Sequence, residues 1–277
     1  MAINLDDIKY FLHVTETLNI TRASERAGVT QPTMSYSIKR LEKEVGGDLL
    51  VRLKSGVQLT KFGEEFALRS RELALNWQQL ENLVSGKDGE VTGKYSIGIH
   101  PSVALYTLEH FLPQLKVSYP KIDFSLIHGL SREITEKVID WKVDFGIVVN
   151  PKKHPDLVIK ELCKDKVMLY GDKENSDLLI SDSNLMQTEA VLKKIDKSKH
   201  KFNRHLTSEN LEVVARLVAI GHGVGILPTR VAMQYEGLKP IDKSLFFEDS
   251  VCLIYRPEKR KDMAGKKIID YISKIKI

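Results

Sequence analysis

The feature that most constrains this chain is a pair of short helical patterns, separated by a tight break, within residues 19–44. The first pattern ends at Gly28, which can adopt the positive φ angle that closes a short helix. The second begins at Thr30, a favoured N-cap residue, and Pro32 lies in its first turn, where a missing N–H is tolerated. Two helices joined by so short a turn predict a helix-turn-helix.

Polar side chains crowd the start of the second helix, where they cannot all be buried. In a helix-turn-helix, the second helix lies in the major groove of DNA and presents its first turns to the base edges. Gln31 can pair with N6 and N7 of adenine, whereas Thr33 and Ser35 can bond bases or phosphates. A solvated helical bundle is the alternative. The predicted DNA contacts are Thr21, Arg22, Gln31, Pro32, Thr33, Ser35, Tyr36, Lys39, Arg52 and Lys54.

The segments on either side of the helix pair favour the same interpretation. Apolar residues at helical spacing predict a preceding helix over about residues 5–18. Residues 49–53 and 57–59 have strand patterns around a turn, which predicts a β-wing. Residues 31–61 hold six basic and three acidic side chains, a local charge of +3 within a chain of net charge +5. This distribution favours contact with a polyanion.

One long helix is expected over about residues 61–84, where apolar residues recur every seven positions. A one-sided apolar stripe needs a second surface, and a second copy of the same helix is the natural candidate. Packing only within its own chain is the alternative. The predicted dimer contacts are Phe66, Leu73, Trp77 and Leu80. Residues 85–94, which are rich in glycine and charge, predict a hinge.

The rest of the chain alternates between strand and helix patterns, which predicts a parallel sheet covered by helices. Strands are expected over residues 95–99, 122–127, 144–149, 157–162, 166–170, 178–182, 223–228 and 251–255. Helices are expected through residues 108–115, from residue 131, over residues 185–195 and 208–220, and at the C-terminal end.

A small-molecule site is expected in this second module. Ligands of open α/β sheets bind beyond the carboxyl ends of the strands, where loops and helix starts converge. Helix starts offer free N–H groups to anions, so we expect a small and anionic effector. For Ser131 and Ser208, plain N-capping is the alternative. The predicted effector contacts are His100, Ser102, Ser131, Asn150, Thr207 and Ser208.

Enzymes and metalloproteins are disfavoured by the motifs. The chain has no GxxxxGK[ST], HExxH, GxSxG or CxxC motif, and "GHGVG" follows a helix pattern instead of opening one. Cys163 and Cys252 lie far apart without metal-ligand spacing. We therefore expect no enzyme, no metal and no cofactor. The chain starts without a signal-peptide pattern and has no run of about 18 apolar residues, so we expect a cytoplasmic protein that does not enter a membrane.

A resemblance to a known family covers the whole chain. Residues 1–63, notably "YFLHVTETLNITRASERAGVTQPTMSYSIKRLEKEVGGDLLVR" and the closing "LTKFG", resemble the winged helix-turn-helix of LysR-type transcriptional regulators. The stretches "SYPKIDFSLIHGLSREITEKVIDWKVDFGIV" and "LEVVARLVAIGHGVGILPTRVA" are similar to the effector domain of that family. The chain departs from the family at Tyr36, which stands where an Arg-like residue is usual. Tyr cannot make the bidentate contact of Arg to guanine.

The resemblance implies an α/β protein with three parts. These are a winged helix-turn-helix over residues 1–63, a linker and dimerisation helix with a hinge over residues 64–92, and a two-lobed effector domain of periplasmic-binding-protein type over residues 93–277. Lobe I would comprise about residues 93–160 and 246–277, and lobe II about residues 161–245. The implied function is transcriptional regulation, with DNA binding or activation modulated by an effector between the lobes. The implied partners are double-stranded DNA with an interrupted inverted repeat and further copies of the chain, in a homodimer or homotetramer. A transport-type solute-binding protein is the alternative for the second module alone.

Overall fold

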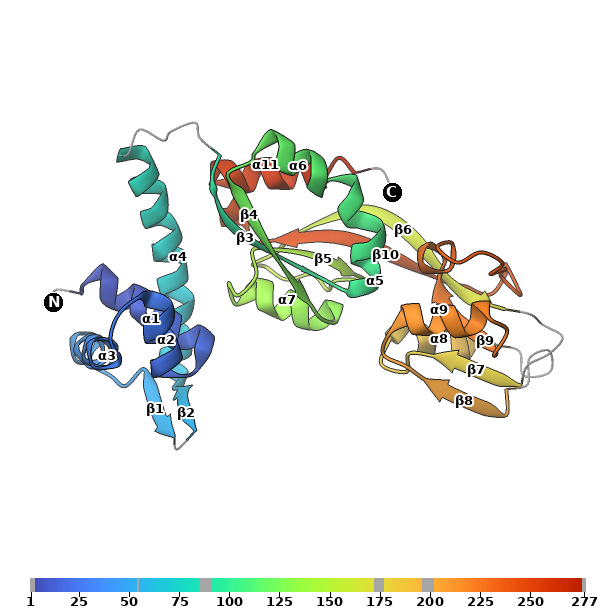
Figure 1. The fold of residues 1–277 in the computed structure, drawn as a ribbon, viewed down its shortest axis with the longest axis horizontal. Coiled ribbons are helices and arrows are strands. Elements are labelled where there is room, and N and C mark those ends of the chain that lie inside the picture. The colour runs from blue at the N-terminus through green and yellow to red at the C-terminus, as the bar shows by residue number, and fades with distance from the viewer. Residues whose placement is uncertain (1–2, 54, 85–90, 172–176, 196–201, 276–277) are drawn as a thin grey trace. The chain divides into compact units, whose positions relative to one another are not determined.

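The computed structural model describes residues 3–53, 55–84, 91–171, 177–195 and 202–275, and Lys54 lies outside them. Its residues form two compact units, Met1–Glu90 and Val91–Ile277, which are described separately (Figure 1). In the described part of the chain, no helix combines the length and the apolar character needed to cross a bilayer.

The first unit consists of four helices and a two-stranded hairpin. These are α1 (Leu5–Thr17), α2 (Ile20–Ala27), α3 (Gln31–Val45), β1 (Leu50–Leu53), β2 (Gly56–Leu59) and α4 (Lys61–Val84). Side-chain oxygens of Asn4, Asn19 and Thr30 accept hydrogen bonds from the first turns of the three short helices. Gly28 and Gly46 end α2 and α3 at φ angles of 67° and 78°. The predicted helix-turn-helix and wing are confirmed, with boundaries close to those expected.

A shared apolar core fixes the short helices of the first unit. Phe11 and Val14 of α1 meet Met34, Ile38 and Leu41 of α3, and all five are buried. The apolar spacing of α1 and α3 therefore faces inward, as helical periodicity predicts.

The hairpin is tied to this core by its backbone. The N–H of Val57 donates to the carbonyl of Leu18 at 3.0 Å. A side chain on Gly56 would meet that carbonyl at 2.6 Å, so the close approach requires glycine.

The second unit is built on one eight-stranded sheet. Its strands are β3 (Gly93–Ile99), β4 (Ile122–His128), β5 (Phe145–Val149), β6 (Val158–Tyr170), β7 (Leu178–Ser181), β8 (Arg204–Thr207), β9 (Val224–Pro228) and β10 (Phe246–Tyr255). Their spatial order is β4-β3-β5-β10-β6-β9-β7-β8. Its helices are α5 (Pro101–Thr107), α6 (Leu112–Ser118), α7 (Ser131–Ile139), α8 (Met186–Lys194), α9 (Leu211–Ala219), α10 (Thr229–Ala232) and α11 (Met263–Ile272), with 3₁₀ turns at Leu108–His110 and Pro257–Arg260.

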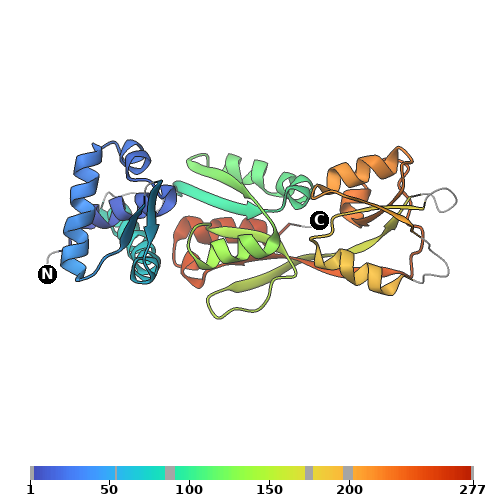
Figure 2. The same ribbon diagram turned by 90° about the horizontal axis from the view of Figure 1, so that it is seen from below.

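The prediction of a parallel sheet is right within each lobe and wrong for the whole. In lobe I, β3 pairs in parallel with β4 and β5, and in lobe II, β7 pairs in parallel with β8 and β9. The long strands β6 and β10 pair antiparallel with each other and with the neighbouring lobe strands, and they run through both lobes (Figure 2). The periodicity of a sequence indicates which strand residues are buried but not the direction of the strand. It therefore could not distinguish parallel from antiparallel pairs here.

Several expected boundaries differ in the structure. The two strands expected over residues 157–162 and 166–170 form the single strand β6, so the lobe boundary expected after residue 160 falls inside it. Of the hinge expected over residues 85–94, residues 85–90 lie outside the described range, and residues 93 and 94 belong to β3. The helix expected through residues 108–115 is divided into α5, a 3₁₀ turn and α6, with Pro113 in the first turn of α6.

Successive strand residues pack on opposite faces of this sheet. On one face, residues such as Ile97, Phe145 and Leu253 join residues such as Ile180 and Val214 in one core that spans both lobes. On the other face, α7 and α8 cover separate apolar clusters, one in each lobe. The continuous core on the first face therefore packs the two lobes against each other.

Candidate DNA-binding surface and interlobe site

The third helix separates a buried stripe from an exposed polar face. Met34, Ser37, Ile38 and Leu41 are buried. The predicted contacts on the opposite face of this helix are exposed, except Ser35, which is half-buried; they are Gln31, Pro32, Thr33, Ser35, Tyr36 and Lys39. Thr21 and Arg22, at the start of α2, are exposed as well. The arrangement leaves polar side chains free at the start of α3, which is the end that a recognition helix presents to base edges.

Arg52 of the wing contacts the third helix near its exposed polar start. Nη2 of Arg52 donates to Oγ of Ser35 at 3.0 Å. Arg52 therefore fixes the orientation of β1 relative to α3, in addition to carrying the positive charge that sequence analysis assigned to it. Lys54, the other predicted wing contact, is the residue outside the described range.

An ion pair between a buried carboxylate and an exposed guanidinium orients α3, and sequence analysis did not find it. Asp7, which is 2% exposed, accepts hydrogen bonds from Nε and Nη2 of Arg40 at 2.7 and 2.6 Å. The guanidinium carbon of Arg40 lies 5.7 Å from the ring centroid of Tyr36. Arg40 thus connects α1 to the exposed aromatic ring of Tyr36 on α3. The two partners are 33 residues apart, and no local spacing signals such a pair.

The long helix α4 exposes part of its apolar stripe. Leu73, Trp77 and Leu80 are 46%, 41% and 53% exposed. These side chains are unusually apolar for a surface. Phe66 differs, because its ring lies 5.6 Å from that of Phe11 within its own chain. Leu73 and Trp77 also line an apolar hollow of about 370 Å³ beside Phe66 and the start of α1.

The predicted effector contacts divide into two groups. His100 caps α5, and its Nδ1 accepts a hydrogen bond from the N–H of Ser102 at 3.3 Å. Burial lowers the pKa of His100, so its imidazole is neutral near pH 7. Asn150, with φ 50°, donates to Oδ1 of Asp249 at 2.7 Å. These three residues lie at the carboxyl ends of lobe I strands, where the sequence placed them.

The other predicted effector contacts have structural partners or different positions. Oγ of Ser131 accepts a hydrogen bond from the N–H of Val149 at 2.9 Å, which ties α7 to β5. Thr207 and Ser208 do not begin α9, because Thr207 ends β8 and Asn210 is the N-cap. The Asn210 side chain accepts from the N–H of Val213, so the true cap lies further along the chain than predicted.

Two buried carboxylates at the junction of the lobes were missed. Asp165 of β6 and Asp249 of β10 are directly opposite in the sheet register and are 7% and 3% exposed. Burial raises the pKa of Asp165, and it raises the pKa of Asp249 to about 6. Oδ2 of Asp165 accepts from the N–H of Arg230 at 3.3 Å, and Oδ2 of Asp249 accepts from Nε2 of Gln187 at 3.1 Å. Acidic residues in these strand patterns resemble ordinary surface positions, so only the pairing of β6 with β10 reveals them.

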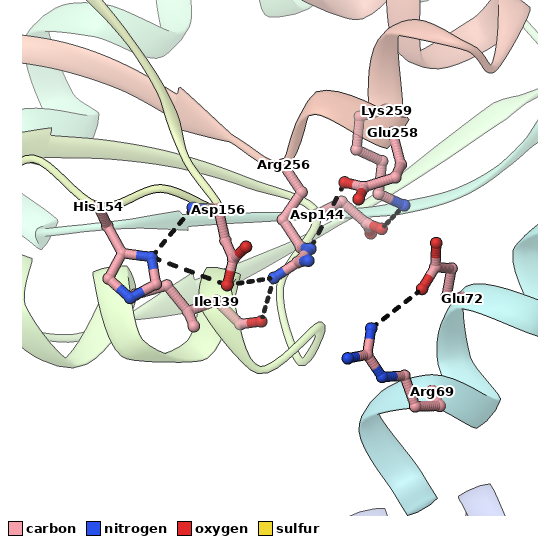
Figure 3. A network of polar contacts seen from close by, with 9 residues as sticks. All are labelled: Arg69, Glu72, Ile139, Asp144, His154, Asp156, Arg256, Glu258 and Lys259. Carbon is pink, nitrogen blue, oxygen red and sulfur yellow. Dashed lines mark hydrogen bonds and ion pairs between the residues drawn. The ribbon is translucent and has the colours of Figure 1, made fainter. Parts of the chain in front are cut away.

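Another polar cluster lies in lobe I, just after the C-terminal end of β10 (Figure 3). The guanidinium carbon of Arg256 lies 4.7 Å from the ring centroid of Trp141, and its Nη1 donates to the carbonyl of Ile139 at 3.0 Å. Nζ of Lys259 is paired with Asp144, which also accepts from the hydroxyl of Ser96. These contacts join the end of β10 to α7 and β5, so the cluster has a structural role.

Models of known protein families match both units. Residues 5–64 match the bacterial regulatory helix-turn-helix protein, lysR family, and residues 88–274 match the LysR substrate binding domain. The chain belongs to the LysR family. It is therefore a DNA-binding transcriptional regulator rather than an enzyme, as the resemblance implied. In the described part of this LysR-family chain, no three His, Cys, Asp or Glu side chains are grouped to hold a metal ion.

Relatives match along most of this LysR-family chain. A hydrogen peroxide-inducible genes activator of Haemophilus influenzae is 24% identical over 92% of this chain and 91% of its own length. The regulator EstR of Acinetobacter baylyi is 26% identical over 88% of this chain and 86% of its own. A full-length OxyR variant from Pseudomonas aeruginosa has the same fold, with a TM-score of 0.76 at 19% identity over 99% of this chain and 94% of its own. Full-length LysG from Corynebacterium glutamicum, solved with bound effector Arg, has a TM-score of 0.70 at 14% identity over 98% of this chain and 96% of its own.

Proposed function

We propose that the protein binds an interrupted inverted repeat in duplex DNA through the polar start of α3 and the wing. The observation that carries this proposal is the exposed face of α3, which is polar although its opposite face is fully buried. Gln31, Thr33 and Tyr36 would read or contact bases, and Lys39 and Arg52 would contact phosphates. DNA as the target supports a cytoplasmic location.

The inverted repeat follows from an expected two-fold dimer, because two recognition helices need two half-sites. The exposed side chains of Leu73, Trp77 and Leu80 support α4 as the dimer seam. Phe66 would contribute less, since Phe11 of its own chain already covers part of it. A homotetramer would require a further surface.

An effector bound between the lobes would modulate binding or activation. His100, Ser102 and Asn150 support this site, because they lie at the carboxyl ends of β3 and β5 close to the strands that join the lobes. One relative of the same fold was solved with bound arginine, which shows that the fold accommodates a small effector. The DNA would thus be bound by residues 1–63, and the subunits would be joined through residues 64–92. The effector would be bound by residues 93–277.

The test selects bound sites from random duplex DNA with the full-length protein, once alone and once with a metabolite extract. We expect enrichment of an interrupted inverted repeat and a change in its occupancy with the extract. Enrichment of single, unpaired half-sites would contradict the two-fold arrangement. Occupancy that no extract changes would contradict the effector role.

A further inference from the structure

Three buried side-chain oxygens lie near the interlobe site without a hydrogen-bond partner among the described residues. They are Oγ of Ser102, Oδ2 of Asp182 and Oε1 of Glu212. Ser102 and Asp182 are each 1% exposed, so water does not satisfy them from the surface. Buried polar atoms in native proteins are nearly always paired, and an unpaired buried carboxylate oxygen is costly. Each of these oxygens can therefore form a hydrogen bond with a ligand.

These three oxygens belong to elements of both lobes. Ser102 lies in the first turn of α5 in lobe I, and its N–H bonds Nδ1 of His100. In lobe II, Asp182 directly follows β7, and Glu212 lies in the first turn of α9. Both carboxylates act electrostatically on the imidazole of His100. The short helix α10 packs against both α5 and α9, and α9 packs against β7, so the elements that carry these side chains are neighbours.

The charges at this place are acidic and uncompensated. Nδ1 of His100 accepts a hydrogen bond, so the neutral ring carries its proton on Nε2 and adds no positive charge. No ion pair to a Lys or Arg is present for Asp182 or Glu212 among the described residues. The first turn of α9 already has the Asn210 cap and the Glu212 carboxylate, which satisfy the positive end of that helix. An anionic ligand would therefore meet two negative charges here.

We propose that the effector carries a positively charged nitrogen, an ammonium or guanidinium group, which binds Asp182 and Glu212 while Ser102 Oγ bonds the same ligand. A charged N–H donor supplies the hydrogen bonds and the charge that both carboxylates lack. A single metal ion does not fit, since the described residues hold no cluster of three metal-ligating side chains. The inference rests on the proposed effector function and replaces the expected anion with a cation.

The test uses the full-length protein with three probes of similar length, which are L-arginine, 1,5-diaminopentane and glutarate. Titration calorimetry and thermal melting follow binding to the native protein, Asp182→Asn and Glu209→Gln. Asn at position 182 keeps the oxygen that caps Asn184 but removes the charge. Glu209 is an exposed carboxylate in the neighbouring loop between β8 and α9, where it accepts from Nδ2 of Asn184 at 3.0 Å, so Glu209→Gln is the matched control.

We expect at least one cationic probe to bind the native protein and Glu209→Gln, with affinity falling about tenfold or more in Asp182→Asn. Without any ligand, Asp182→Asn should melt at a higher temperature than the native protein, because it removes an unpaired buried charge. A carboxylate with a purely structural role would instead give a lower melting temperature.

Three results would overturn the inference. These are the absence of binding by both cationic probes, tighter binding of glutarate to Asp182→Asn than to the native protein, and a lower melting temperature of ligand-free Asp182→Asn. None of them affects the proposed function, which fails if the selection yields single half-sites or if no metabolite alters occupancy of the selected DNA site. The two failures are thus distinguishable.

Discussion

Gln31 and Ser35 lie one turn apart on α3 but in different surroundings. The Gln31 side chain is exposed at the start of the helix, whereas Ser35 is half-buried and accepts a hydrogen bond from Arg52. Gln31 is therefore available for a base edge, while Ser35 is shared with the wing. Mutations at the two positions should therefore affect DNA affinity differently, although both residues were predicted as DNA contacts.

Replacing Gln31 by Ala should weaken binding to the selected DNA site by about 1–3 kcal/mol and leave binding to random DNA almost unchanged. The physical reason is that a base-edge contact distinguishes sequences, whereas phosphate contacts do not. Fluorescence anisotropy with both DNAs measures the difference, and Gln114→Ala, an exposed position in the second unit, serves as the control. Equal losses on both DNAs would exclude base reading by Gln31.

Replacing Arg52 by Ala should weaken binding to selected and random DNA alike, and should reduce the slope of log affinity against log salt by about one. Loss of a phosphate contact and loss of the bond to Ser35 both contribute. Arg52→Lys keeps the charge but not the planar donor, so it should restore the salt slope more fully than the affinity. An unchanged slope in Arg52→Ala would show that Arg52 only positions the wing.

Asp249 should make stability depend on pH in mildly acidic solution. Its pKa rises from 3.8 to about 6 on folding, mainly through burial, so the folded protein binds the proton more tightly than the unfolded chain. The free energy of unfolding should therefore fall as pH rises from about 4 to about 6, by about 3 kcal/mol at most, and then level off. Asp249→Asn should flatten this part of the curve in urea titrations.

Glu248 provides the control for that experiment. It is an exposed neighbour whose pKa is lowered by the ammonium group of Lys164, at 2.7 Å, so its effect on stability has the opposite sign. Glu248→Gln should keep the fall in stability between about pH 4 and pH 6. If Asp249→Asn shows the same fall as the native protein, burial of Asp249 is not its source.

Among the elements, α4 and β6 show how length decides the role of a segment. The helix α4 has 24 residues, too many for the small core of the first unit to cover, and its apolar residues Leu73, Trp77 and Leu80 are exposed. The strand β6 has 13 residues, longer than either lobe requires, so it passes from one lobe into the other. The extra length of β6 thus connects one lobe to the other.

Replacing Leu73 by Asp should convert the protein into monomers and strongly reduce its affinity for the inverted repeat. A charge in a buried seam costs several kcal/mol unless it is paired. Sedimentation velocity measures the change, and Met233→Asp, at an exposed apolar position in the second unit, should leave the native oligomer intact. A fully dimeric Leu73→Asp protein would place the seam elsewhere.

At the scale of the whole molecule, cores define the units that fold together. The first unit has its own apolar core around Phe11 and Met34. In the second unit, one core includes Ile97 of lobe I, Ile180 of lobe II and Leu253 of the shared strand β10. The lobes should therefore unfold together, although their outer faces have separate clusters.

Calorimetry of the full chain should resolve at most two unfolding transitions. Ile38→Ala should lower only the free energy of unfolding of the first unit, and Leu253→Ala only that of the second unit. Each loss should be about 2–5 kcal/mol, because both side chains are fully buried. A third transition, or a Leu253→Ala effect confined to part of the second unit, would show that the lobes unfold independently.

The sequence by itself determined the elements and the nature of the DNA-binding unit. Caps at Asn19 and Thr30, the left-handed glycine at Gly28 and the apolar period of α3 are local signals, and local signals depend only on residues a few positions apart. The polar start of α3 was recognisable for the same reason, since a short-range pattern shows which side chains cannot be buried.

Only the tertiary structure decided the strand directions, the single strand β6, the cap at Asn210 and the polar groups between the lobes. Asp165 meets Asp249 across 84 residues of chain, and Asp7 meets Arg40 across 33, so no neighbouring residue signals either contact. The fold also buries carboxylate oxygens of Asp182 and Glu212, and the charges of both residues act on the imidazole of His100. The charge of a site depends on which distant segments fold around it, and this is why the sequence suggested an anion where we propose a cation.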